Sequence, residues 1–128
     1  MKLGIAQINP TLGNLDRNVE IFRKTVKEAI EKGLELLVFP ELGLTGYFLK
    51  DMVPTVAQRL DSKLIREIQR VSKKISIVVG LVEESSDYCF YNSVIYFEAG
   101  KILHVHRKVY LPTYGILTRS ATFPEELR

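Results

Sequence analysis

The chain has 128 residues, of which 18 are Lys or Arg and 15 are Asp or Glu, so its formal net charge is +3. That length suits one domain, since domains usually contain about 100–200 residues. Apolar residue types make up 46% of the chain and charged types 26%, which excludes intrinsic disorder. The single cysteine, Cys89, excludes a fold held together by internal disulfides.

The sequence carries no signal for membranes or nucleic acids. No apolar run approaches the ~18 residues of a membrane span. Gln7 and Asn9 interrupt the apolar start, which therefore does not resemble a signal peptide. We expect a cytoplasmic protein without a membrane partner. Basic and acidic residues alternate along the expected helices, as in the pair Glu28 and Lys32, so we also expect no nucleic-acid partner.

The first forty residues predict a strand–helix–strand unit. Residues 2–9 alternate loosely and predict a strand. Residues 15–30 predict an amphipathic helix, followed by Gly33 as a left-handed cap. Residues 34–39 form a short apolar run that ends at Pro40 and predicts a second strand. In such a unit the two strands lie parallel. The apolar positions of the helix are Leu15, Val19, Phe22, Val26 and Ile30.

A loop, a helix and a third strand are expected next. Residues 40–54 are rich in glycine and predict a loop. A second amphipathic helix is expected over residues 60–71, with Asp61 or Ser62 as the N-cap of its main part. Residues 75–82 are nearly all apolar, which is typical of a strand covered on both faces.

The last two strands are expected to form a hairpin. Residues 91–97 and 102–109 have strand patterns and flank a short turn that contains Gly100. The complete order is then β-α-β-α-β-β-β, which predicts an α/β layered domain.

Glu41 is the first candidate for a functional residue. It lies two residues past Phe39, just beyond the carboxyl end of a predicted strand, where functional groups gather in open α/β sheets. Partial desolvation there would raise the pKa of its carboxyl and suit it to act as a general base. The alternative is that Glu41 only caps the following turn.

Lys108 is the second candidate. It ends the last predicted strand and precedes the loop Val109–Pro112. A lysine at such a position can stabilise a developing oxyanion by its charge and hydrogen bonds. The alternative is an edge-strand lysine that discourages aggregation.

Both candidates lie in motifs of one known family. The run Leu37–Tyr47 strongly resembles the glutamate motif of the nitrilase (carbon–nitrogen hydrolase) superfamily, and His106–Pro112 resembles its lysine motif. The opening Ile5–Pro10 and the triplet Tyr91–Ser93 are similar to the family in order and spacing. The resemblance covers residues 1 to about 115.

The resemblance implies about half of a four-layer αββα sandwich of the nitrilase type, truncated before the cysteine-bearing strand. It implies a Glu-Lys-Cys mechanism in which a thiolate attacks a nitrile, amide or carbamoyl carbon of a small molecule. Glu41 would be the general base, Lys108 would stabilise the tetrahedral intermediate and Tyr47 would line the substrate pocket. No cofactor is expected.

The expected nucleophile is missing. The family's cysteine follows its lysine motif, whereas this chain has no cysteine after Lys108. Cys89 precedes Lys108 and has no evident base beside it, so we expect a packed thiol without a catalytic role. The chain alone is therefore expected to be inactive.

Three alternatives remain open. The chain could be a non-catalytic remnant or a subunit that pairs with an intact relative. It could be a fragment of the glutaminase-like domain of an NAD synthetase, to which Asn9–Gly13 is also similar. It could instead be an unrelated α/β ligand-binding module, in which Glu41 and Lys108 would lie far apart.

The division of the chain follows from the same motifs. Residues 1–115 are expected to be the N-terminal half of a carbon–nitrogen hydrolase domain, and residues 116–128 a tail unlike the family. Loss of one base from codons for Ile-Phe-Asp-Glu-Glu-Arg-Tyr-Phe can yield the residues at 116–123, so an out-of-frame tail is one hypothesis. Half a sandwich leaves an apolar sheet face uncovered, which predicts a homo-oligomer or aggregation.

No metal site is expected. His104 and His106 lie two residues apart and would face the same side of a strand, but zinc requires at least three protein ligands. Gly43 and Gly46 do not form a dinucleotide-binding fingerprint and are expected to allow tight turns around Glu41.

Overall fold

The computed structural model describes residues 1–46 and 53–108, which form one five-stranded sheet in the order β1-β2-β3-β4-β5. The strands are β1 (Leu3–Ile5), β2 (Leu36–Val38), β3 (Ser76–Glu84), β4 (Phe90–Glu98) and β5 (Lys101–Arg107). The helices are α1 (Leu15–Glu31), α2 (Val53–Val56) and α3 (Lys63–Val71). The predicted α/β class and element order are confirmed. The four-residue helix α2 was not expected, because it falls where the sequence predicts the end of a loop.

The parallel part of the sheet consists of β1, β2 and β3. The first strand is shorter than the predicted range 2–9, because its partner β2 ends early. The amide of Ala6 still donates to the carbonyl of Val38 at 2.8 Å, but Pro40 then turns the chain away from the sheet. Beyond that point no strand of the described residues pairs with β1.

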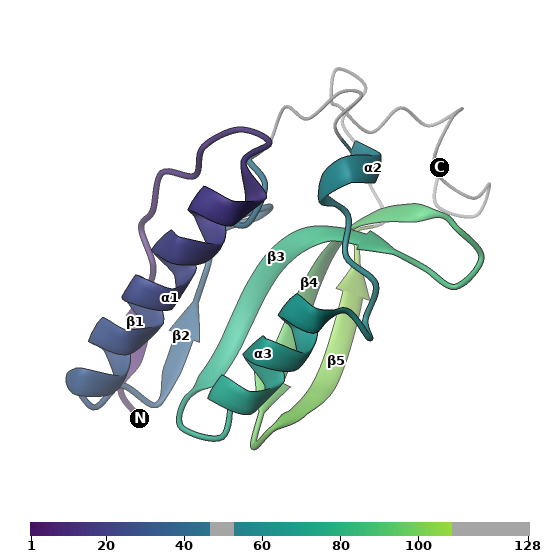
Figure 1. Ribbon diagram of the computed structural model, residues 1–128. Coiled ribbons are helices and arrows are strands. Elements are labelled where there is room, and N and C mark those ends of the chain that lie inside the picture. The colour runs from purple at the N-terminus through teal and green to yellow at the C-terminus, as the bar shows by residue number, and fades with distance from the viewer. Residues whose placement is uncertain (47–52, 109–128) are drawn as a thin grey trace.

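The long helices α1 and α3 cover one face of the sheet (Figure 1). Asn14 caps α1 by accepting a hydrogen bond from the amide of Arg17 at 3.0 Å. Gly33 has the left-handed conformation predicted for it, with φ +71°. Ser62, and not Asp61, caps α3, which consequently begins later than residue 60.

The main core lies between these two helices and the sheet. Apolar side chains of α1 and α3 pack there on alternate residues of β3 and β4, and the largest fully buried ones are Phe22, Ile65, Ile68, Ile77, Leu81, Ile95 and Phe97. A smaller second cluster surrounds α2 and contains Leu42, Val53, Val56, Val82 and Tyr91.

The strand β3 is covered on both faces only near its carboxyl end. Val79 and Leu81 are fully buried beneath the helices, and Val82 is buried in the second cluster. Val78 is only half-buried. The prediction of a strand covered on both faces therefore holds for the end of β3 that lies near Leu42.

The antiparallel part of the sheet is the predicted hairpin of β4 and β5. Ala99 and Gly100 at its tip both have positive φ, as a two-residue hairpin turn requires. The pairing changes register between Tyr96 and Phe97, so β5 carries a bulge before it reaches Arg107.

The face of the sheet away from α1 and α3 is apolar at its parallel edge. Leu3 and Ile5 are 53% and 77% exposed, and they pair with Leu36 and Val38 on the neighbouring strand. Paired residues project to the same side of a sheet, so these four side chains form one apolar surface, which we call the open face.

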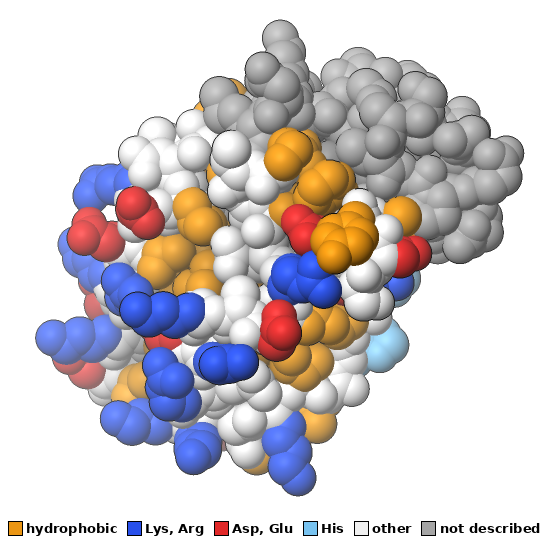
Figure 2. All heavy atoms as spheres, turned by 45° about the vertical axis from the view of Figure 1, so that its right-hand side comes forward, with side chains coloured by type: hydrophobic (Ala, Val, Ile, Leu, Met, Phe, Trp, Pro, Cys, Tyr) orange, Lys and Arg blue, Asp and Glu red, His pale blue; other side chains and the backbone are white. Residues whose placement is uncertain are grey.

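Charged side chains are numerous on the side of the molecule shown in Figure 2. Lysine and arginine side chains gather over the lower part of the view in Figure 2, among fewer acidic ones. A groove of about 540 Å³ lies between α1 and α3, with Phe22 and Val26 in its lining. An ion pair of Arg23 with Glu67, 2.7 Å from Nε to Oε2, links the two helices at this groove.

Candidate active site

The loop that follows β2 passes across β3 at Gly80. Gly80 alternates with Val79 and Leu81, which face the helices, so a side chain there would point to the opposite side of the sheet. A Cβ atom at Gly80 would lie 2.7 Å from the amide nitrogen of Leu42 and 3.1 Å from the Cα of Glu41. Only glycine lets the Glu41 loop approach the strand this closely.

Leu42 fixes the direction in which Glu41 leaves that loop. It has φ +51°, an uncommon conformation for a residue with a side chain, and it is almost completely buried in the second cluster. Its carbonyl accepts hydrogen bonds from the amides of Thr45 and Gly46 at 3.1 and 2.9 Å. The tight turns predicted around Glu41 are therefore present, with Gly46 at φ +83°.

The carboxylate of Glu41 binds two donors from the antiparallel part of the sheet. Its Oε1 accepts a hydrogen bond from Nζ of Lys108 at 2.6 Å and another from Nδ2 of Asn92 at 2.7 Å. Lys108 follows β5 and Asn92 lies in β4, so three separate segments meet at one oxygen. The structure thus brings together the two residues that the sequence singled out, and it adds Asn92.

The geometry leaves the site open to a reactant. The side chains of Glu41 and Lys108 are 41% and 34% exposed. Both donors reach Oε1, and no described residue donates a hydrogen bond to Oε2 of Glu41. The two contacts at Oε1 hold the carboxylate in place.

The pKa of Glu41 corrects one expectation. Burial raises this pKa, as predicted, but the hydrogen bonds from Lys108 and Asn92 and the positive charge of Lys108 together outweigh burial and lower it below its usual value. The expected net increase is wrong. The carboxylate is ionised at neutral pH, which is the state that a general base requires.

The lowered pKa of Glu41 determines how the stability of the fold depends on pH. Because the pKa of Glu41 is lowered in the folded state, the interaction stabilises the fold above the unfolded-state pKa and is lost as pH falls through the folded-state pKa. We expect Lys108→Met to be destabilised relative to wild type near pH 7 and to approach it in acid. Urea unfolding between neutral and acidic pH measures this, and a pH-independent difference would contradict the ion pair.

Asn92 is a site residue that no local sequence pattern singles out. It is buried, and its partner Glu41 lies 51 residues away along the chain, so no local pattern reveals the contact. The available signal was the family-like triplet Tyr91–Ser93, whose central residue is Asn92.

Two other sequence candidates have different outcomes. Tyr47, the predicted pocket residue, lies outside the described residues. Cys89 lies in the turn between β3 and β4, where its backbone bonds to Ser85 and its side chain packs against the second cluster. The hydrogen bond from the Ser85 hydroxyl is the main cause of the lowered pKa of Asp87, and a hydrogen bond from the Cys89 side chain contributes less. The half-buried thiol is packed, as predicted, but the expectation that no base lies beside it is wrong, because the carboxylate of Asp87 is its hydrogen-bond partner.

The histidines of β5 lie together, as their spacing predicts, with ring centroids 6.5 Å apart. Among residues 1–46 and 53–108, no group of three His, Cys, Asp or Glu side chains is placed to hold a metal ion. No helix within those residues is long and apolar enough to span a membrane.

Sequence comparison now identifies the family. The family model for carbon-nitrogen hydrolase matches residues 2–126, so the chain belongs to the carbon–nitrogen hydrolase family. The predicted resemblance is confirmed. Family membership and the 2.6 Å contact between Glu41 and Lys108 together remove the alternative of an unrelated ligand-binding module.

The chain is similar to parts of longer proteins. It is 32% identical to a glutamine-dependent NAD(+) synthetase of Thermotoga maritima over 124 residues, which are 96% of the chain and 22% of that protein. It is 26% identical to a protein N-terminal amidase of Saccharomyces cerevisiae, covering 87% of the chain and 26% of the amidase.

A solved structure shows the same arrangement. The glutamine-dependent NAD+ synthetase of Acinetobacter baumannii superposes with a TM-score of 0.73 at 27% identity, over 94% of this chain and 23% of that one. The fold is therefore part of a nitrilase-type domain. The chain spans about a quarter of this relative. The boundary predicted at residue 116 lies beyond the described residues and stays a prediction.

Proposed function

We propose that Glu41, Lys108 and Asn92 form the proton-transfer and oxyanion-binding part of a carbon–nitrogen hydrolase site. The proposal rests on one observation: Asn92 and Lys108 both donate hydrogen bonds to Oε1 of Glu41. An ionised carboxylate beside an ammonium group, partly open to solvent, is suited to amide or nitrile hydrolysis through an acyl-enzyme.

In the proposed mechanism Glu41 takes the proton of a cysteine thiol, and the sulfur attacks the carbonyl carbon of an amide. The oxygen becomes negatively charged, and Lys108 stabilises that charge. The C–N bond breaks as Glu41 returns the proton to the leaving amine. Glu41 then deprotonates a water molecule, which hydrolyses the thioester and regenerates the thiol. Asn92 holds the carboxylate throughout these steps.

The attacking cysteine is proposed to come from outside these 128 residues. Cys89 is the single cysteine, and it belongs to the packed turn before β4. We therefore propose that this chain by itself is inactive. It would function as part of a longer polypeptide or beside a subunit that carries the sulfur.

Glutamine is the substrate that the comparisons favour. Several relatives are glutamine-dependent NAD(+) synthetases, and the solved structure of another such synthetase shares the described fold at 27% identity. We propose that the site descends from one that releases ammonia from the side-chain amide of glutamine. A second candidate is hydrolysis of another amide or of a nitrile. It would differ only in the pocket that selects the substrate.

A chimera tests the proposed roles. The present chain would replace the segment that it matches in the Thermotoga maritima synthetase, and ammonia release from glutamine would be measured. We expect the chimera to be active. In it, Glu41→Gln should lower kcat by about 10²–10⁴-fold and Lys108→Met by about 10²–10³-fold.

The control variant is Glu20→Gln, which changes a carboxylate on the exposed side of α1 and should leave kcat unchanged. A folded, active chimera whose kcat does not respond to Glu41→Gln would refute the assignment. For the isolated chain, we expect no ammonia release above that of its own Glu41→Gln variant.

The open face supports a separate proposal about association. Ile5 and Leu3 expose apolar surface on a sheet face that α1 and α3 do not cover, and such surfaces drive association. We propose that two copies of the isolated chain pair through this face. Sedimentation equilibrium should show a dimer that Ile5→Lys weakens and that Leu12→Lys, at an exposed loop residue, does not. A monomer at all concentrations would exclude the pairing.

A further inference from the structure

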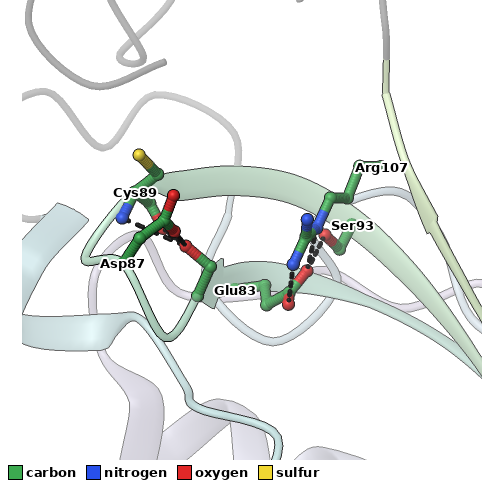
Figure 3. A network of polar contacts seen from close by, with 6 residues as sticks. Glu83, Asp87, Cys89, Ser93 and Arg107 are labelled. Carbon is green, nitrogen blue, oxygen red and sulfur yellow. Dashed lines mark hydrogen bonds and ion pairs between the residues drawn. The ribbon is translucent and has the colours of Figure 1, made fainter. Parts of the chain in front are cut away.

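An ion pair with a buried carboxylate lies on the opposite face of the sheet from the candidate active site. Glu83 on β3 is almost completely buried, with its side chain 1% exposed. Arg107 on β5 binds both of its carboxylate oxygens, from Nε at 3.0 Å and from Nη2 at 2.8 Å. The hydroxyl of Ser93 on β4 donates to the same carboxylate at 2.8 Å. In Figure 3 both side chains point toward Glu83.

Stability alone gives no reason for this arrangement. Removing the carboxylate of Glu83 from water costs several kcal/mol, and apolar residues of similar volume are often as stabilising or more so. The guanidinium also stacks over the ring of Tyr91, with its carbon 4.1 Å from the ring centroid. Three directional contacts thus fix the side chain of Arg107 more strictly than apolar packing would.

The register of the sheet connects this ion pair to the site. Ser93 pairs with Arg107, and the next residues, Asn92 and Lys108, are joined by a backbone hydrogen bond of 2.9 Å. Successive side chains of a strand point to opposite faces. Ser93 and Arg107 therefore face the helices beside Glu83, whereas Asn92 and Lys108 face the other way.

This end of β5 needs an anchor. Among the described residues it is an edge strand that pairs with β4 alone, and the site residue Lys108 immediately follows its last residue. The register of β4 and β5 already changes at one point, the bulge between Tyr96 and Phe97. A further slip by one residue would turn Lys108 to the helical face and away from Glu41.

We propose that Glu83, Arg107 and Ser93 act as a positioning clamp, which holds the ends of β4 and β5 in register so that Asn92 and Lys108 both reach Glu41. The clamp contacts no reactant. Its role rests on the proposed function of Glu41 and Lys108, because it acts only through them.

The test is the pKa of Glu41, measured by carbon-13 NMR titration of its carboxyl group in the complete 128-residue chain. Lys108→Met is the reference variant, because it removes the charged donor and should raise the pKa of Glu41, whose burial remains. In Arg107→Lys, which keeps the charge but loses the two-pronged contact, we expect the pKa of Glu41 to rise by nearly as much as in Lys108→Met.

The double variant Glu83→Leu/Arg107→Met provides a second measurement. It replaces the ion pair by apolar side chains and should remain folded, yet the pKa of Glu41 should rise as in Arg107→Lys. The matched control is Arg23→Lys, which weakens the other two-pronged ion pair, with Glu67, on the helical surface. It should leave the pKa of Glu41 unchanged.

The outcomes separate the two proposals. A rise in Lys108→Met without any rise in the Arg107 variants overturns the clamp and leaves the proposed function intact. A pKa that responds to the clamp in a chain whose chimera hydrolyses no glutamine supports the clamp and counts against the proposed function. No response to Lys108→Met itself overturns both.

Discussion

Replacing Gly80 by alanine is expected to displace Glu41 from its donors. The new Cβ would lie 2.7 Å from the carbonyl oxygen of Pro40 and 2.7 Å from the amide nitrogen of Leu42. Both contacts are with backbone atoms, so no side-chain rotation relieves them. We expect a loss of about 1–3 kcal/mol in the free energy of unfolding, as for other overpacked sites. The pKa of Glu41 should rise as its contact with Lys108 is broken.

Gly4→Ala is the control. Its Cβ would approach an atom even more closely, at 2.5 Å, but that atom is Cδ1 of Leu34, the end of a flexible side chain. We expect Gly4→Ala to cost less stability and to leave the pKa of Glu41 unchanged. Denaturant unfolding and NMR titration of the three proteins measure both effects. Equal behaviour of the two variants would show that the loop over Gly80 moves freely.

The elements of the fold were predictable because their signals are local. The apolar spacing from Leu15 to Ile30 defines α1 within a single helical face, and Gly33 and Gly100 mark turns by their own conformational freedom. The early end of β1 could not be predicted in this way, because it depends on where β2 leaves the sheet. The length of a strand is a property of its neighbour as well as of its own residues.

The site was predictable only in part, for the same reason. Glu41 and Lys108 stand at strand exits and in family-like motifs, so the sequence points to both. Asn92 and Gly80 act across contacts between distant segments, which no local pattern records. The pKa of Glu41 was predicted in the wrong direction because burial could be foreseen from its position, whereas the competing hydrogen bonds depend on that tertiary contact.

Glu83 shows the limit of sequence patterns most clearly. It follows an apolar run at the end of a strand, which is where a solvent-exposed glutamate is commonly found, yet its side chain is among the most buried in the described part of the molecule. Its partner Arg107 is 24 residues away. The position of a charged residue at the end of a predicted strand therefore does not show whether its side chain faces water or an opposite charge.

Arg107→Met is expected to be the most destabilising substitution at this ion pair. It leaves the buried carboxylate of Glu83 with the Ser93 hydroxyl as its remaining side-chain donor among the described residues. Breaking a buried pair in this way costs about 3–5 kcal/mol. Glu83→Gln should cost less, about 1.5–3 kcal/mol, because the side chain of Arg107 is 40% exposed and can turn toward water.

The double variant Glu83→Leu/Arg107→Met should recover most of that loss, since it leaves neither charge buried without a partner. Replacing Arg107 and replacing Glu83 should therefore lower the free energy of unfolding by different amounts, and the double-mutant cycle should give a large coupling energy. Urea unfolding of the four proteins at neutral pH measures these values. Equal costs for the two single variants, with simple addition in the double variant, would show that Glu83 is not held as an unsolvated charge by Arg107.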